Sequence, residues 1–183
     1  IFAVIPLFML MGEFLAKCGA ASDLFTLINR STRRIPGRLG VATVLANAVF
    51  AFVTGVSIAA AAAFSKIAYP EMRRYGYERQ FSLGCIAGSA CLGMLIPPSV
   101  LMIVWGVLTE LAIGKLFIAG IIPGLLLTGS FMLYIAITSL LSGNAMREEK
   151  VSFSYKLKVS VHLIPPMIVF GVVMGSLYFG IAT

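Results

Sequence analysis

The chain has 183 residues, of which 60% are hydrophobic and 11% are charged, and its formal net charge is +7. A soluble domain usually carries about 25% charged residues, so this composition excludes an ordinary soluble protein and indicates a polytopic membrane protein. Most basic residues gather in short loops between apolar segments, a pattern typical of cytoplasmic loops rather than of a nucleic-acid-binding surface. We therefore expect an all-α polytopic membrane protein that contacts the lipid bilayer and has no nucleic-acid partner.

Residues 1–38 are predicted to form the end of a membrane helix and then an amphipathic helix on the cytoplasmic side. The apolar start contains one acid, Glu13, which is either a functional group or an interfacial partner of Lys17 one turn later. Residues 22–38 alternate apolar and basic positions, with Ser22 as the expected N-cap. The chain opens inside an apolar segment without an initiator Met, so we expect it to be an internal piece of a longer protein.

Residues 39–68 are predicted to form a re-entrant helical hairpin. They contain a run of 27 uncharged residues that has basic residues on both sides. If both basic flanks are cytoplasmic, the run must leave the membrane through the face by which it enters. Helices over 40–53 and 58–68 would each be about 17–21 Å long, too short to cross the bilayer. The turn falls at 54–57, where Gly55 supplies backbone freedom.

Residues 80–109 are predicted to form a broken transmembrane helix. This stretch has 30 uncharged residues and is interrupted by Gly93 and by Pro97-Pro98. Two adjacent prolines remove two backbone donors and block continuation of a helix. We expect half-helices near 81–92 and 99–109.

The remaining segments complete the predicted topology. The charge-neutral loop 110–115 is expected outside the cell, and 116–141 is expected to cross the membrane again. Residues 142–159 form a basic cytoplasmic loop, and 160–183 begin another transmembrane helix, with His162 near its interfacial start. This arrangement keeps every strongly basic loop, at 30–38, 66–79 and 147–158, on one side.

The two predicted breaks are the candidate functional site. Each lies near mid-membrane, where non-helical backbone survives only when it is buried in protein or lines a wet cavity. Free carbonyls with the hydroxyls of Thr54, Ser57 and Ser99 suit a small hard cation such as Na⁺, and half-helix N-termini suit a carboxylate. Secondary transporters place ion and substrate sites at such breaks. The alternative is that the breaks are packing kinks, which we favour for Pro123 and Pro165-Pro166.

An enzyme is not supported. The sole histidine lies away from Ser57 and Ser99 in depth, and no HExxH, GxSxG or paired intramembrane aspartates are present. No Walker A motif is present either, so ATP-driven transport is not indicated. The three cysteines have no metal-binding spacing, and we interpret them as small apolar fillers.

Four stretches match one family in order and spacing: "IPLFMLMGEFLAKCG" (5–19), "TGVSIAAAAAF" (54–64), "IAYPEMRRYGY" (67–77) and "GMLIPPSVLMIVWGVLTELAIGKLFIAGIIPGLLL" (93–127). Together they resemble the large membrane subunit of tripartite ATP-independent periplasmic (TRAP) transporters. The resemblance implies the first repeat of an elevator-type, sodium-coupled importer in the bacterial inner membrane. It further implies a small membrane subunit, a soluble periplasmic binding protein and a small organic anion, such as a carboxylate or a sialic-acid-like molecule.

The resemblance also implies which residues bind. Na⁺ is the coupling ion, with no other cofactor, and Ser57 and Ser99 would contribute hydroxyl ligands. Val56 stands where the family often has serine, and Trp105 stands where a tyrosine is common. Rival interpretations are another elevator-type carrier and a non-transporting membrane scaffold. The ion- and substrate-binding roles would fall on Thr54, Gly55, Val56, Ser57, Gly93, Pro97, Pro98 and Ser99.

Overall fold

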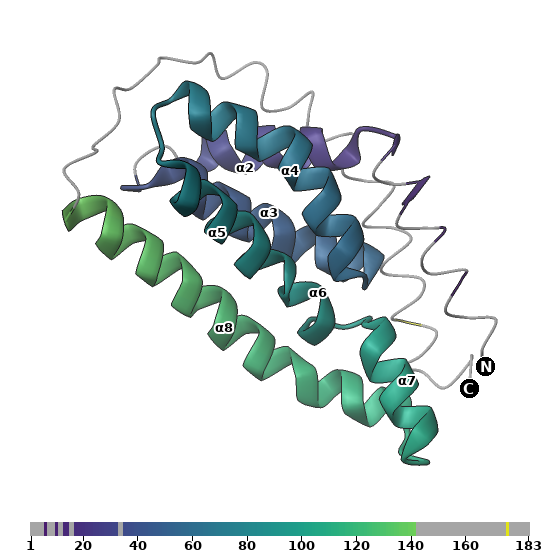
Figure 1. Ribbon diagram of the computed structural model, residues 1–183. Coiled ribbons are helices and arrows are strands. Elements are labelled where there is room, and N and C mark those ends of the chain that lie inside the picture. The colour runs from purple at the N-terminus through teal and green to yellow at the C-terminus, as the bar shows by residue number, and fades with distance from the viewer. Residues whose placement is uncertain are drawn as a thin grey trace.

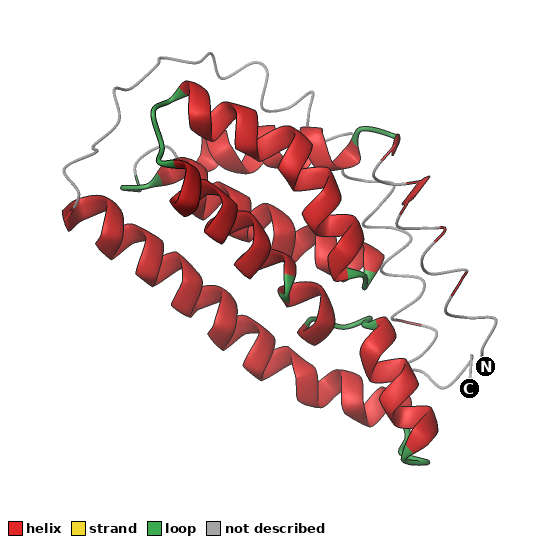
Figure 2. Ribbon diagram, in the orientation of Figure 1, coloured by secondary structure: helices red, strands yellow, loops and turns green. Residues whose placement is uncertain are grey.

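The computed structural model describes residues 6, 10, 13–14, 17–32, 35–141 and 175, and these form helices and loops without any strand. The predicted all-α class is confirmed for these residues (Figure 2). The predictions for 142–159, for His162 and for the helix beginning at 160 lie outside the described residues. The helices are α2 (Ala20–Ser31), α3 (Arg38–Thr54), α4 (Ser57–Arg74), α5 (Arg79–Ala90), α6 (Leu92–Leu95), α7 (Val100–Leu108) and α8 (Ile113–Leu141).

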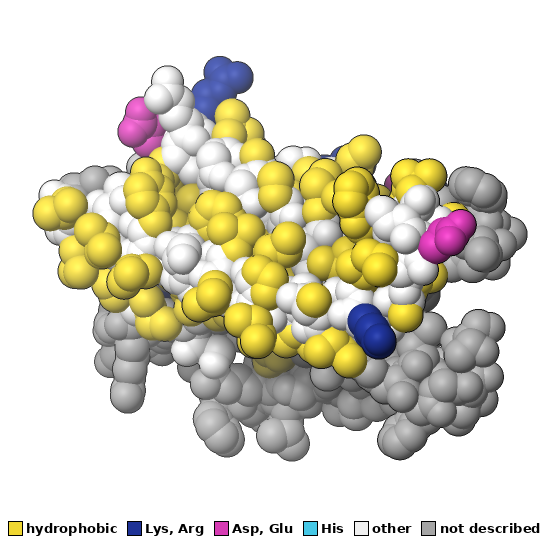
Figure 3. All heavy atoms as spheres, turned by 90° about the horizontal axis from the view of Figure 1, so that it is seen from below, with side chains coloured by type: hydrophobic (Ala, Val, Ile, Leu, Met, Phe, Trp, Pro, Cys, Tyr) yellow, Lys and Arg dark blue, Asp and Glu magenta, His cyan; other side chains and the backbone are white. Residues whose placement is uncertain are grey.

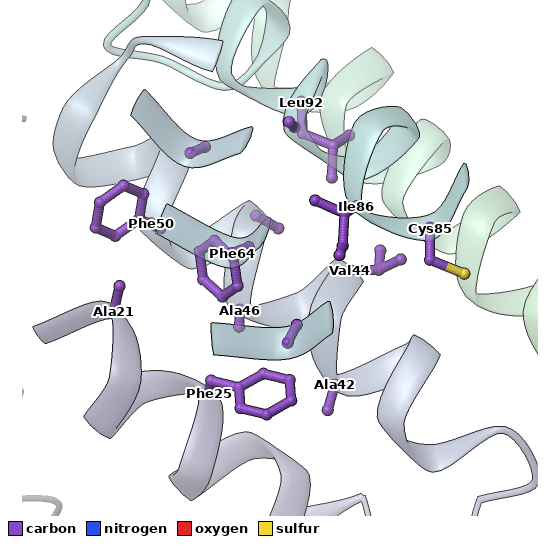
Figure 4. Packing of buried hydrophobic residues seen from close by; sticks show 14 of the residues in the cluster. Ala21, Phe25, Ala42, Val44, Ala46, Phe50, Phe64, Cys85, Ile86 and Leu92 are labelled. Carbon is purple, nitrogen blue, oxygen red and sulfur yellow. The ribbon is translucent and has the colours of Figure 1, made fainter. Parts of the chain in front are cut away.

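Helix α3 is the centre of the fold, with α2, α4, α5 and α8 packed around it (Figure 1). Its residues are apolar on all sides and nearly all are buried, as expected for a helix without a polar face. Phe64 of α4 packs edge-to-face against Phe25 of α2 and Phe50 of α3, with ring centroids 6.5 and 5.7 Å apart (Figure 4). These three rings join α2, α3 and α4 into one apolar cluster.

Helix α2 differs from the predicted amphipathic helix over 22–38. It starts at Ala20, after Gly19 in a left-handed conformation with φ 80°, and it ends at Ser31. Ser22 lies within the first turn, so the prediction that it is the N-cap was wrong. Its apolar side, including Leu24, is buried against α3 and α4.

Helices α3 and α4 form the hairpin, and each is longer than its sequence pattern indicated. Helix α4 runs past the predicted end at 68 to Arg74 and contains Pro70. Pro70 and Lys66 are both exposed, so the carbonyl that loses its helical partner is not sealed inside the core. The guanidinium of Arg38 lies 5.2 Å from the Tyr75 ring, so the chain returns to the end where α3 began.

The broken helix consists of α5, α6 and α7, and its two arms, Arg79–Leu95 and Val100–Leu108, are bent by 41°. Among the described residues, α8 is the one helix long and apolar enough to cross a membrane alone, and the bent pair adds a second if it counts as one span. Helix α8 begins at Ile113, three residues before the predicted start. Its outer face carries large apolar side chains typical of contact with lipid, among them Ile122, Leu126, Leu133 and Leu140. Figure 3, which views the molecule from below the orientation of Figure 1, shows many hydrophobic side chains and few charged ones on the described part of this face.

Candidate functional site at two helix breaks

The hairpin tip is narrower than the predicted turn over 54–57. Helix α3 ends at Thr54 and α4 begins at Ser57, so Gly55 and Val56 alone are non-helical. Gly55 has φ 62°, in the left-handed region, and Val56 is extended with φ −127°. A Cβ atom on Gly55 would collide with the carbonyl oxygen of Pro98. Glycine at the tip is therefore required by its conformation and by its neighbour.

The second break covers Ile96 to Ser99, between α6 and α7. All four residues are buried, and the Pro97–Pro98 peptide bond is cis. Gly93, which we predicted to interrupt the helix, lies inside α6 instead. A Cβ atom on Gly93 would lie only 3.1 Å from the backbone nitrogen of Ser57. Gly93 thus allows α6 to approach the hairpin tip closely, rather than breaking the helix itself.

The two breaks adjoin each other. The backbone N–H of Val100, the first residue of α7, donates a hydrogen bond of 3.2 Å to the carbonyl oxygen of Gly55. Together with the contacts Gly55–Pro98 and Gly93–Ser57, this bond holds the tip of the hairpin against the break. The structure thus brings the predicted site residues together in two adjoining segments.

The site hydroxyls are not equivalent. Ser99 is fully buried and its Oγ donates to the Met94 carbonyl at 2.7 Å, while Thr54 Oγ1 donates to the Phe50 carbonyl at 3.0 Å. Each oxygen keeps lone pairs that can still contact a cation, because donating uses only the proton. Ser57 is half-buried at the first position of α4. The N-cap of this helix is Val56, whose apolar side chain supplies no capping bond. The N-terminus of α4 therefore has neither a side-chain cap nor an acid in its first turn to offset its positive potential.

The available donors favour a hard cation over a transition metal. No group of three or more His, Cys, Asp or Glu side chains occurs among the residues that the structure describes. Backbone carbonyls and hydroxyls are what the two breaks supply, and oxygen ligands of this kind suit hard cations.

The sequence did not predict a buried polar pair that lies two turns from the hairpin tip. Asn47 of α3 and Ser89 of α5 are both buried, and Asn47 Nδ2 donates to Ser89 Oγ at 2.5 Å. Ser89 Oγ in turn donates to the Cys85 carbonyl, while Asn47 Oδ1 has no hydrogen-bond partner. An asparagine in a long uncharged run was the available signal, because polar side chains at membrane depth usually bond another helix.

Comparison with known proteins decides the family. The model of the family "Tripartite ATP-independent periplasmic transporter, DctM component" matches residues 1–183. The chain belongs to the TRAP large permease family. The resemblance found in the sequence is thereby confirmed.

Curated TRAP large permeases resemble the chain over most of its length. A C4-dicarboxylate permease of Pseudomonas aeruginosa is 43% identical over 74% of this chain and 32% of its own length. A C4-dicarboxylate permease of Rhodobacter capsulatus is 33% identical over 98% of this chain and 44% of its own length. An ectoine permease of Halomonas elongata is 32% identical over 95% of this chain and 42% of its own length. The chain thus spans less than half the length of these TRAP permeases.

Proposed function

We propose that this chain forms part of a Na⁺-coupled TRAP importer of small organic anions in the bacterial inner membrane. A periplasmic binding protein delivers the substrate, and a small membrane subunit completes the transporter. The two helix breaks supply one half of the ion and substrate site. The observation that carries this proposal is the contact between the breaks, in which Gly55 packs on Pro98 and its carbonyl accepts the Val100 N–H.

The chemistry of the two breaks supports both ligands. The Gly55 carbonyl has a second lone pair for Na⁺, and the Ser57 and Ser99 hydroxyl oxygens add further coordination. The uncapped N-terminus of α4 attracts a carboxylate. The names of similar permeases mention C4-dicarboxylate, ectoine and sialic acid, and these small molecules each carry a carboxylate. A carboxylate bound near a helix N-terminus fits that shared chemistry.

The test is Na⁺-dependent uptake by the full-length large subunit in proteoliposomes, with the small subunit and the binding protein present. Ser57→Ala and Ser99→Ala each remove one neutral oxygen ligand, and each should raise the Na⁺ concentration for half-maximal uptake by about two- to tenfold. Replacing Pro97 and Pro98 together by alanine should have a larger effect. The double change restores two backbone donors and lets the half-helices join, which removes several carbonyls from the site.

Thr138→Ala is the matched control. Its hydroxyl donates to the Tyr134 carbonyl at 2.8 Å on the exposed side of α8, as the Ser99 hydroxyl donates to the Met94 carbonyl at the second break. Thr128, remote from both breaks in the sequence, is a poorer control because it lies one turn beyond Gly124. A Cβ atom on Gly124 would lie 3.0 Å from Ile96 at the second break. If both serine variants and the proline variant keep the wild-type sodium dependence, the breaks are packing kinks and the proposal fails.

A further inference from the structure

The N-terminus of α3, at the opposite end from the hairpin tip, has no side-chain cap and no acid in its first turn. Its N-cap is Gly37, which has φ 71° and supplies no side-chain bond. The first α-helical bond runs from the Val41 N–H to the Gly37 carbonyl at 3.0 Å, so the N–H groups before Val41 have no helical acceptor. No acid lies in the first turn, and the first residue is Arg38. A cation at the positive end of a helix dipole is the reverse of the stabilising arrangement.

Three buried polar atoms near this turn have no hydrogen-bond partner: Arg38 Nε, Tyr77 Oη and Ser139 Oγ. Tyr77 is 5% exposed and Ser139 is 7% exposed. Each of the three groups carries a hydrogen that it can donate. Buried donors are normally satisfied, so unpartnered donors at one helix end point to an acceptor that would bond them.

Both buried hydroxyl side chains lie against the start of α3. A Cβ atom on Gly37 would lie 3.0 Å from the Ser139 Cβ, which brings the end of α8 to the N-cap. Burial raises the pKa of Tyr77, and the backbone of Leu39 and the guanidinium of Arg38 act in the opposite direction. The Tyr77 hydroxyl therefore lies near the Leu39 backbone and the Arg38 guanidinium, without a hydrogen bond of good geometry to either.

Packing fixes Tyr77 in this position. Its ring stacks on Phe81 with centroids 5.8 Å apart and an interplanar angle of 14°. Its carbonyl accepts a hydrogen bond of 2.8 Å from Arg73 Nη1. The hydroxyl is thus held at the α3 N-terminus before any ligand binds, which lowers the entropic cost of binding.

We propose that the N-terminus of α3 binds a phosphate group, with Arg38, Tyr77 and Ser139 as its side-chain donors. A tetrahedral phosphate presents acceptor oxygens in several directions, so it can meet donors from α3, α8 and the loop before α5 together. The helix N-terminus supplies backbone N–H groups and a favourable dipole. The group belongs either to an anionic lipid headgroup or to free phosphate, and the chemistry of recognition is the same.

The experiment follows thermal unfolding of the full-length large subunit in phosphatidylcholine nanodiscs. One arm replaces a rising fraction of the lipid with phosphatidylglycerol, and the other adds inorganic phosphate at constant ionic strength. One of the two should raise the unfolding midpoint of the wild type. Tyr77→Phe and Ser139→Ala should each require about tenfold more of the same ligand for an equal shift, because each loses one hydrogen bond to a charged group.

The design separates binding from folding. Without ligand, Tyr77→Phe removes an unpartnered buried hydroxyl and should leave the midpoint unchanged or raise it. Arg79→Gln is the control, since it removes one positive charge from an exposed position near the same end. Arg79→Gln should respond to both ligands as the wild type does.

A response to phosphatidylglycerol alone assigns the site to lipid, and a response to inorganic phosphate assigns it to the free ion. The proposal is overturned if neither ligand shifts the wild type, or if Arg79→Gln loses as much of the response as the two variants.

Discussion

Gly55 and Gly76 both have positive φ, 62° and 82°, but their surroundings differ. A Cβ atom on Gly55 would collide with the Pro98 carbonyl, whereas a Cβ atom on Gly76 would meet nothing within 4 Å. Gly84, inside α5, also has open space around it and ordinary helical φ. These three glycines separate the cost of backbone conformation from the cost of a tight contact.

We expect a graded result from alanine at these positions. Gly84→Ala should be neutral or stabilise the fold by up to about 1 kcal/mol, since alanine is the better helix former. Gly76→Ala should cost about 1–2 kcal/mol from the left-handed conformation alone. Gly55→Ala should cost clearly more than Gly76→Ala, and denaturant unfolding in detergent measures all three. Equal costs at Gly55 and Gly76 would mean that the tip can withdraw from the second break without penalty.

Helices α3 and α5 are joined by the hydrogen bond from Asn47 to Ser89. This bond ties the hairpin to the broken helix two turns below the tip. Because both side chains are buried, removing one partner leaves the other without its bond.

We expect a double-mutant cycle to reveal this coupling. Ser89→Ala leaves both polar atoms of the buried Asn47 amide without a partner and should destabilise the fold by about 1–3 kcal/mol. Asn47→Ala should cost less, because Ser89 Oγ keeps its bond to the Cys85 carbonyl and the unpartnered Oδ1 is removed. The coupling energy between the two should be about 0.5–1.5 kcal/mol, measured by unfolding in detergent. Strictly additive effects would show that the two side chains do not depend on each other.

The ends of the helices show which parts of the fold the sequence pattern could predict and which it could not. Pro97-Pro98 and Gly55 located both breaks, because proline removes donors and glycine permits positive φ wherever they occur. The end of α2 at Ser31 and the role of Gly93 were missed. The role of Gly93 depends on a partner distant in sequence, since Gly93 packs against Ser57, and the burial of Leu24 depends likewise on α3 and α4. The sequence pattern within one helix does not show which residues of another helix will pack against it.

The basic segments that flank the hairpin, before α3 and at the end of α4, lie together at one end of the molecule. Arg38 packs on Tyr75, so the start of α3 and the end of α4 lie together. The loop between α7 and α8, which contains Glu110, lies at the far end of α7 (Figure 1). Basic loops favour the cytoplasm, so we expect Glu110 to lie outside.

We expect single cysteines to report this topology in a cysteine-free full-length permease. An impermeant thiol reagent added to intact cells should label Glu110→Cys, and it should label Ile35→Cys and Arg73→Cys only after permeabilisation. Ile35 and Arg73 are described and exposed, whereas Arg34 lies outside the described residues. If positions 35 and 73 label from opposite sides, α3 and α4 cross the membrane as a single span. The 39–68 segment would then not be a re-entrant hairpin, and the proposed site would be wrong.

The bond between the Gly55 carbonyl and the Val100 N–H has a mechanical consequence. It fastens the hairpin tip to the first residue of α7, a helix of nine residues that ends at Leu108 beside the outer loop. Nine helical residues make a stiff rod of about 13 Å. We expect a displacement of the tip to tilt α7 and to move its other end, for as long as this bond holds. If Glu110 lies outside the cell, as the topology predicts, we expect a dye at this position to report movement of the hairpin tip.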